Sequence, residues 1–152
     1  MTSEKKVSAK RETEDDLRKE AGLLDHFCKM RKIEWKKLGN GAKYRIDAVL
    51  LKGKDVVGWA EVKNYDAGLF LGLNVQKYIE GCALAQETEK PFLFIFSHNR
   101  RVGYLKVHGG GAYSDLEKRL KYCGGTPKGR MPLPDDIEPM FLFDEKDVRW
   151  LS

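Results

Sequence analysis

The sequence predicts an α/β fold in the order α-β-β-β-α-β, with helices covering both faces of one sheet. Residues 13–32 and 74–88 carry apolar side chains at helical spacing. Between them, the runs 43–51 and 56–63 have the length of strands and are apolar on both faces, so each face needs a covering layer. A chain of 152 residues, 41% of them hydrophobic and 34% charged, is expected to form a single domain with its own core.

The N-terminal residues 1–12 are polar and mostly charged, so we expect a flexible tail ahead of a domain that spans 13–152. The first helix is expected to run from Thr13 to Lys32, and its buried positions recur at helical spacing: Leu17, Leu24, Phe27 and Cys28. A strand at 33–38, with alternating apolar and charged residues, is expected to follow.

The next two runs, 43–51 and 56–63, are predicted to form a β-hairpin around the short connection 52–55. A second helix is expected to begin after its cap, Asn74, and to end near Thr88. Its predicted buried stripe is Val75, Tyr78, Ile79, Cys82 and Ala85. Further strands are predicted at 92–96, 102–107 and 140–143.

The C-terminal part contains one more predicted helix and an uneven distribution of charge. A capping box at 114–117 predicts a helix that ends at Gly124-Gly125, and 127–139 is predicted to be a loop. Residues 98–130 hold eight Lys and Arg against two acids, a pattern that suits a polyanion such as nucleic acid, although a solvated face is the alternative. The candidate nucleic-acid contacts are Arg100, Arg101, Lys106, Lys128 and Arg130.

Three charged residues interrupt the apolar hairpin. Glu61 and Lys63 leave the same face of one strand because they are two residues apart, and Asp47 lies in the middle of the neighbouring strand. Burial of a charge is costly unless the charge is paired or binds a metal. Carboxylate oxygens suit Mg²⁺ or Mn²⁺, and a lysine beside the ion could activate a water or neutralise charge in the transition state.

The register of the hairpin decides whether the two carboxylates meet. A three-residue loop, Gly53-Lys54-Asp55, would place Asp47 opposite Glu61, close enough for both to hold one ion. A two-residue loop would instead place Asp47 opposite Ala60 and send the carboxylates to opposite faces. A metal site shared by both carboxylates therefore needs the register that the three-residue loop gives.

Asp47, thirteen intervening residues and then Glu61-Val62-Lys63 resemble the motif of the PD-(D/E)xK nuclease superfamily. The order α-β-β-β-α-β matches its restriction-endonuclease-like core, a mixed central sheet flanked by helices. The resemblance covers about residues 13–97 and leaves 98–152 as a basic C-terminal extension. It implies that Asp47 and Glu61 bind the metal and that Lys63 assists catalysis. Ile46 stands where the motif nominally has proline.

The resemblance implies two further site residues. Members of the superfamily often add an acid from the first helix, and we expect Glu20 in that role, with rivals on the same helix at Glu14, Asp15 and Asp16. RecB-like members place a glutamine in the helix after Glu-x-Lys, and Gln76 looks similar. Glu80 stands where those members commonly have tyrosine, so the match is partial.

The function implied by the resemblance is that of a Mg²⁺-dependent DNA endonuclease in recombination, repair, or phage or mobile-element DNA processing. A junction-resolving enzyme is one specific possibility, and since such enzymes are small dimers with a similar Glu-Val-Lys strand, a homodimer is compatible with it. The alternatives are an exonuclease that acts on DNA ends and a non-catalytic nucleic-acid-binding module on the same fold.

Other classes of site are less favoured. The three cysteines are far apart and form no CxxC pair, which argues against a disulfide framework or a cysteine-rich zinc site and fits a reducing cytoplasm. No apolar run approaches the roughly 18 residues that span a bilayer, so we expect no membrane segment. His98 and His108 belong to no metal-binding pattern.

Overall fold

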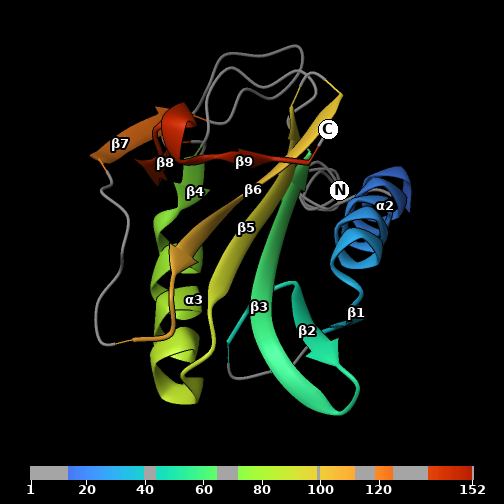
Figure 1. Ribbon diagram of the computed structural model, residues 1–152. Coiled ribbons are helices and arrows are strands. Elements are labelled where there is room, and N and C mark those ends of the chain that lie inside the picture. Colours follow the sequence, from blue (N-terminus) through green and yellow to red (C-terminus); the bar gives the residue numbers. More distant parts are fainter. Residues whose placement is uncertain are drawn as a thin grey trace, which may run out of the picture.

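The structure is a computed structural model that describes residues 14–39, 44–64, 72–98, 100–111, 119–124 and 137–151. It has an α/β architecture in which one helix packs on each face of a mixed central sheet (Figure 1). The helices are α2 (Glu14–Arg31) and α3 (Val75–Thr88). The predicted fold class, a mixed sheet between helices, is confirmed at this level. The predicted tail at 1–12 lies outside the described residues.

The central sheet has six strands in the order β1-β2-β3-β5-β6-β9. Their bounds are Glu34–Lys37 for β1, Ala48–Lys52 for β2, Asp55–Asn64 for β3, Phe92–His98 for β5, Arg101–His108 for β6 and Arg149–Trp150 for β9. All neighbours are antiparallel except β3 and β5, which are parallel because the chain crosses over through α3 between them. The carboxyl ends of β3 and β5 therefore lie at the same edge of the sheet.

A smaller sheet contains β4 (Gly72–Asn74), β8 (Ile137–Leu142) and β7 (Arg119–Gly124), in that order, and a short 3-10 helix covers Glu145–Asp147. Neither β4 nor β9, which have three and two residues, was predicted from the sequence. Strands this short acquire their structure from the strand beside them, and a periodic pattern needs more residues to become visible.

The helix predicted to end at Gly124-Gly125 is wrong over the residues that the structure describes, because Arg119–Gly124 is strand β7. The segment Leu120, Lys121, Tyr122 alternates apolar and charged residues, which suits a strand, and β7 pairs along its length with β8. The predicted loop is also too long, since its last residues, 137–139, belong to β8. The capping box at 114–117 lies outside the described residues.

Helix α2 covers one face of the sheet. Its buried side chains pack against apolar residues of the hairpin: Leu23, Leu24, Phe27 and Cys28 contact the cluster that contains Ala48, Leu50, Ala60 and Val62. Burial, with the charge of Asp25, raises the pKa of the Cys28 thiol to about 11, so this cysteine is a core residue and no nucleophile at neutral pH. No helix in the described ranges is long and apolar enough to cross a membrane.

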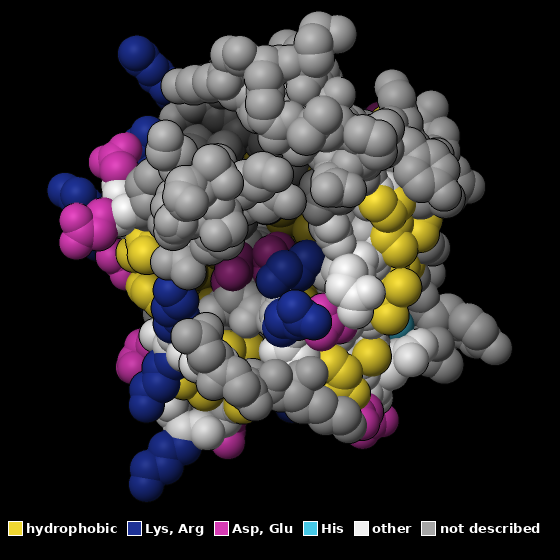
Figure 2. Space-filling view, turned by 180° about the vertical axis from the view of Figure 1, so that it is seen from behind, with side chains coloured by type: hydrophobic (Ala, Val, Ile, Leu, Met, Phe, Trp, Pro, Cys, Tyr) yellow, Lys and Arg dark blue, Asp and Glu magenta, His cyan; other side chains and the backbone are white. Residues whose placement is uncertain are grey.

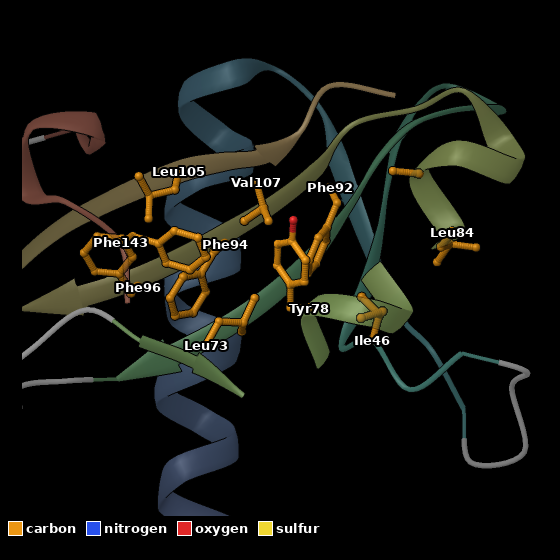
Figure 3. Packing of buried hydrophobic residues seen from close by; sticks show 11 residues of the cluster. Ile46, Leu73, Tyr78, Leu84, Phe92, Phe94, Phe96, Leu105, Val107 and Phe143 are labelled. Atoms are coloured by element: carbon orange, nitrogen blue, oxygen red, sulfur yellow. The ribbon is translucent and has the colours of Figure 1, made fainter. Parts of the chain in front are cut away.

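Helix α3 covers the other face, where the aromatic core of the molecule lies (Figure 3). Asn74 caps the helix as predicted, since its side chain accepts hydrogen bonds from the backbone N–H groups of Gln76 and Lys77. The predicted buried stripe is wrong at Ile79, which is 53% exposed. Gly81 faces the sheet instead, because a Cβ there would overlap the ring of Phe92 and only glycine permits this close packing.

Candidate functional site

The turn of the β2–β3 hairpin is the shorter of the two alternatives. Lys52 pairs with Asp55, so the loop has the two residues Gly53-Lys54 and not three. Gly53 adopts a left-handed φ of 64°, a conformation that favours glycine and allows so tight a turn. In a regular ladder this turn would separate the two carboxylates.

A β-bulge restores the register. Leu51 pairs with Val56 but Leu50 pairs with Gly58, so Val57 is an extra residue on β3. Beyond the bulge Ala48 pairs with Ala60, which is the register that the longer loop would have produced. Asp47 precedes Ala48 and therefore lies opposite Glu61, which follows Ala60. The expected opposition of the two acids is thus present, but a bulge produces it and not a longer loop.

The carboxylates of Asp47 and Glu61 each accept a hydrogen bond from the backbone of the opposite segment. The N–H of Asp47 donates to Glu61 Oε1 at 3.2 Å, and the N–H of Val62 donates to Asp47 Oδ2 at 2.9 Å. One oxygen of each carboxylate is thus held by the opposite segment, and the two side chains cannot separate without loss of both bonds.

Glu61 is a buried acid, only 3% exposed, at the end of an apolar strand. Burial and then the nearby charge of Asp47 raise the pKa of Glu61 to about 8, against the opposing influence of Lys77, Lys63 and the hydrogen bond from Asp47. Because two carboxylates in a poorly solvated place repel each other, their ionised form needs a cation. The chemistry of this donor set is that of a hard divalent ion bound by oxygen.

Lys77 of α3 supplies a positive charge to the pair, and the sequence reasoning did not find it. Its Nζ lies 3.7 Å from Glu61 Oε2 and also donates a hydrogen bond to the carbonyl of Arg45. The available signal was its place in the first turn after the Asn74 cap, one residue beyond Gln76. Gln76 itself is exposed on that turn.

Glu80, one turn further along α3, is the second residue that sequence reasoning left without a role. Its Oε1 accepts a hydrogen bond from the backbone N–H of Arg45 at 3.2 Å. Its Oε2 is buried and has no hydrogen-bond partner among the described residues. Lys77 and Glu80 therefore hold the carbonyl and the N–H of the same residue.

The other predicted residues lie on two faces of the sheet. Lys63 is exposed and leaves β3 on the side of Glu61 and Trp59, whose indole donates to Thr88 of α3. Glu20 belongs to α2, which packs against the opposite face. Within the described ranges no three His, Cys, Asp or Glu side chains form a group that could hold a metal, and Glu20 is not seen in such a group. Its role as a ligand stays a prediction that rests on the resemblance.

The candidate nucleic-acid contacts that the structure describes are also divided between the two faces of the sheet. Arg101 pairs with His98 at the sheet edge where β3 ends, and its guanidinium stacks on Trp150 at 4.2 Å. Trp150 packs on the α3 face, so Arg101 shares that face with Lys63. Lys106 is five residues further along the strand and leaves the opposite face. Arg100 is exposed in the preceding turn, and Lys128 and Arg130 lie outside the described residues.

Acidic and basic side chains also meet in a hollow near the centre of the face shown in Figure 2.

Comparison of the chain with protein-family models, with curated proteins and with solved structures found no match in any of the three.

Proposed function

We propose that this chain is a divalent-metal-dependent nuclease of the PD-(D/E)xK type, which hydrolyses phosphodiester bonds in DNA. The observation that carries the proposal is the reciprocal bonding of Asp47 and Glu61, which holds two carboxylates together where an apolar hairpin ends. An ion pair with a lysine alone would need only one carboxylate. Two carboxylates that are held together, one of them buried, favour a site for a cation of higher charge.

The metal would be held by Asp47 and Glu61. Mg²⁺ is the favoured ion, with Mn²⁺ as a substitute, because the side chains offer oxygen donors and leave room for the waters that Mg²⁺ retains. When bound, such an ion lowers the pKa of a coordinated water and polarises a phosphoryl oxygen. The backbone bonds from Asp47 and Val62 keep the carboxylates oriented for this task without reorganisation.

Lys63 would act beside the ligands. It leaves β3 on the same face as Glu61 and is exposed, so its ammonium group can reach a phosphate that approaches from solvent. There it would orient the attacking water or neutralise negative charge that develops on the phosphate. Gln76, which is exposed on the first turn of α3, would contact the same substrate.

A polyanionic substrate is supported by the basic residues at the same edge. Lys63 pairs with Phe96 on β5, and Phe96 pairs with Gly103 on β6, two residues from Arg101. Arg101 is thus two strand spacings, about 10 Å, across the sheet from the end of β3. A DNA strand that crosses this edge would meet both cations on the face that carries the acidic pair.

The arrangement of the central elements is consistent with the proposal. Helix α2, strands β1 to β3, helix α3 and strand β5 follow the order α-β-β-β-α-β, with the short β4 added before α3. Recombination, repair and phage or mobile-element DNA processing are the settings in which we place such an enzyme. A branched junction is the specific substrate that we favour for testing.

Incubation with supercoiled, linear and branched DNA, in Mg²⁺ or in EDTA, tests the function. An endonuclease nicks or linearises supercoiled circles in Mg²⁺ and is inactive in EDTA, whereas an exonuclease degrades only linear DNA. Binding of DNA without cleavage in Mg²⁺ or Mn²⁺ would identify a non-catalytic module. Equal cleavage in EDTA would refute the metal-dependent mechanism.

A further inference from the structure

Residues 44–46 lie beside α3 just before the hairpin begins, and they lead directly into Asp47. They precede β2, so the backbone of Arg45 forms no ladder bond in the described sheets. Its N–H donates to Glu80 Oε1 at 3.2 Å, and its carbonyl accepts from Lys77 Nζ. Two side chains of α3 thus take the place of a neighbouring strand.

We infer that Lys77 and Glu80 are positioning residues that hold Arg45 on α3 and thereby place the carboxylate of Asp47 beside Glu61. This inference rests on the proposed function, since it assigns the placement of a ligand that the function requires. Neither residue needs to touch the metal or the DNA for this role.

The contacts on either side of Arg45 support the assignment. Tyr44 Oη donates to Glu87 Oε2 at 2.7 Å, and the side chain of Ile46 is buried in the core beneath α3. Lys77, Glu80 and Glu87 lie within about 80° of one another around the helix axis, because three, seven and ten residues correspond to about 0.8, 1.9 and 2.8 turns. The segment is therefore docked along the helix by consecutive contacts that end at Asp47.

Lys77 connects both segments of the candidate site. Its ammonium group contacts the Arg45 carbonyl on one side and, at 3.7 Å, Glu61 Oε2 on the other. The Glu61 side chain is only 4% exposed and that of Lys77 31%, so solvent screens this contact less than it screens a surface ion pair. A single cation thus links the residues that precede Asp47 to the second ligand.

Glu80 allows a sharper test, because its observed contact uses one oxygen only. Any side chain of the same length with an oxygen at that place can accept from the N–H of Arg45, whether or not it is charged. Glutamine retains both the length and the oxygen. Aspartate retains the charge but is one methylene shorter. The two substitutions therefore separate positioning from a role that depends on charge.

The experiment measures Mn²⁺ affinity by titration calorimetry without DNA, for the unmodified chain and for Glu80→Ala, Glu80→Asp and Glu80→Gln. We expect Glu80→Ala and Glu80→Asp to weaken binding roughly tenfold, and Glu80→Gln to stay within about threefold of the unmodified chain. Glu87→Gln is the matched control, since it removes the same charge from the same face of α3 at a contact farther from Asp47.

The outcomes are distinguishable. Strong binding by Glu80→Asp with weak binding by Glu80→Gln would show that charge matters and would overturn the inference. Equal affinities in all variants would overturn it as well, while the proposed function would stand. Absence of Mn²⁺ binding by the unmodified chain would refute the proposed function and the inference together. If Glu80→Ala does not fold, the comparison of Asp with Gln decides alone.

Discussion

The backbone N–H of Asp47 donates to the side chain of Glu61 at 3.2 Å, so the residue that precedes one strand of the hairpin is fastened to the other strand by its partner carboxylate. The bond from Val62 to Asp47 Oδ2 completes the exchange. Because each acid is held by the main chain opposite it, removal of one side chain also disturbs the orientation of the other. Substitutions at either position should therefore be read together with a measurement of stability.

The candidate catalytic residues should be indispensable for DNA cleavage. Asp47→Asn, Glu61→Gln and Lys63→Ala are each expected to lower the single-turnover rate in Mg²⁺ by at least about a hundredfold, while DNA binding is largely retained. Lys106→Ala is the control for Lys63→Ala, because it removes an exposed lysine from the opposite face. Wild-type rates in the three variants would contradict the assignment of the site.

Arg101 and Lys106 should differ in their contribution to DNA binding, although both are basic residues of β6. The side chain of Arg101 projects from the same face of the sheet as that of Lys63. Arg101→Ala is therefore expected to reduce the log–log salt slope of DNA binding by about one unit. Lys106→Ala should leave the slope nearly unchanged. Fluorescence anisotropy across a salt series provides the measurement, and equal changes in both variants would place the DNA elsewhere.

Without metal, Glu61 should make the fold less stable as the pH rises. The pKa of Glu61 is raised from its ordinary 4.5 to about 8 on folding, so the folded chain binds an extra proton between these values. Stability from this group is complete below the lower pKa and is lost as the pH rises through the higher one. As the pH rises, the free energy of unfolding of the unmodified chain should therefore fall by an amount on the order of a few kcal/mol relative to that of the Glu61→Gln variant.

Urea denaturation in EDTA from about pH 5 to about pH 9 measures this difference. Addition of Mg²⁺ at the alkaline end should restore stability to the unmodified chain, because an ion that binds only the folded state stabilises it, and should not do so for Glu61→Gln. A difference between the two proteins that does not change with pH would show that the Glu61 carboxyl is not perturbed.

Two helical glycines should respond in opposite ways to the same substitution. A Cβ at Gly81 would overlap the ring of Phe92, so Gly81→Ala is expected to destabilise the fold by about 1–3 kcal/mol. A Cβ at Gly22 of α2 would meet nothing within 4 Å, so Gly22→Ala should stabilise the fold by about 0.5–1 kcal/mol through helix propensity. Thermal unfolding of both variants measures the pair, and stabilisation by Gly81→Ala would contradict the observed packing.

Local patterns in the sequence were sufficient for the main elements and for the candidate ligands. The Asn74 cap, the helical spacing before Arg31 and the apolar run at β5 depend on side chains a few residues apart, so the predicted elements agree with the structure. Asp47, Glu61 and Lys63 could be predicted as site residues because charges within apolar strands are costly wherever those strands are placed. That reasoning needs no knowledge of the tertiary contacts.

Only the tertiary structure decided how these parts meet. The two-residue turn alone predicts that Asp47 and Glu61 lie apart. The bulge at Val57 reunites them, and the local sequence offers only Gly58 beside it, a general indication of a bulge that does not fix the register. Arg119–Gly124 became a strand because β8 lies beside it. Lys77 and Glu80 contact Arg45 across more than thirty residues of chain, and such a contact exists only after α3 has packed on the sheet. Contacts between distant segments depend on packing, and a pattern along the chain carries no information about them.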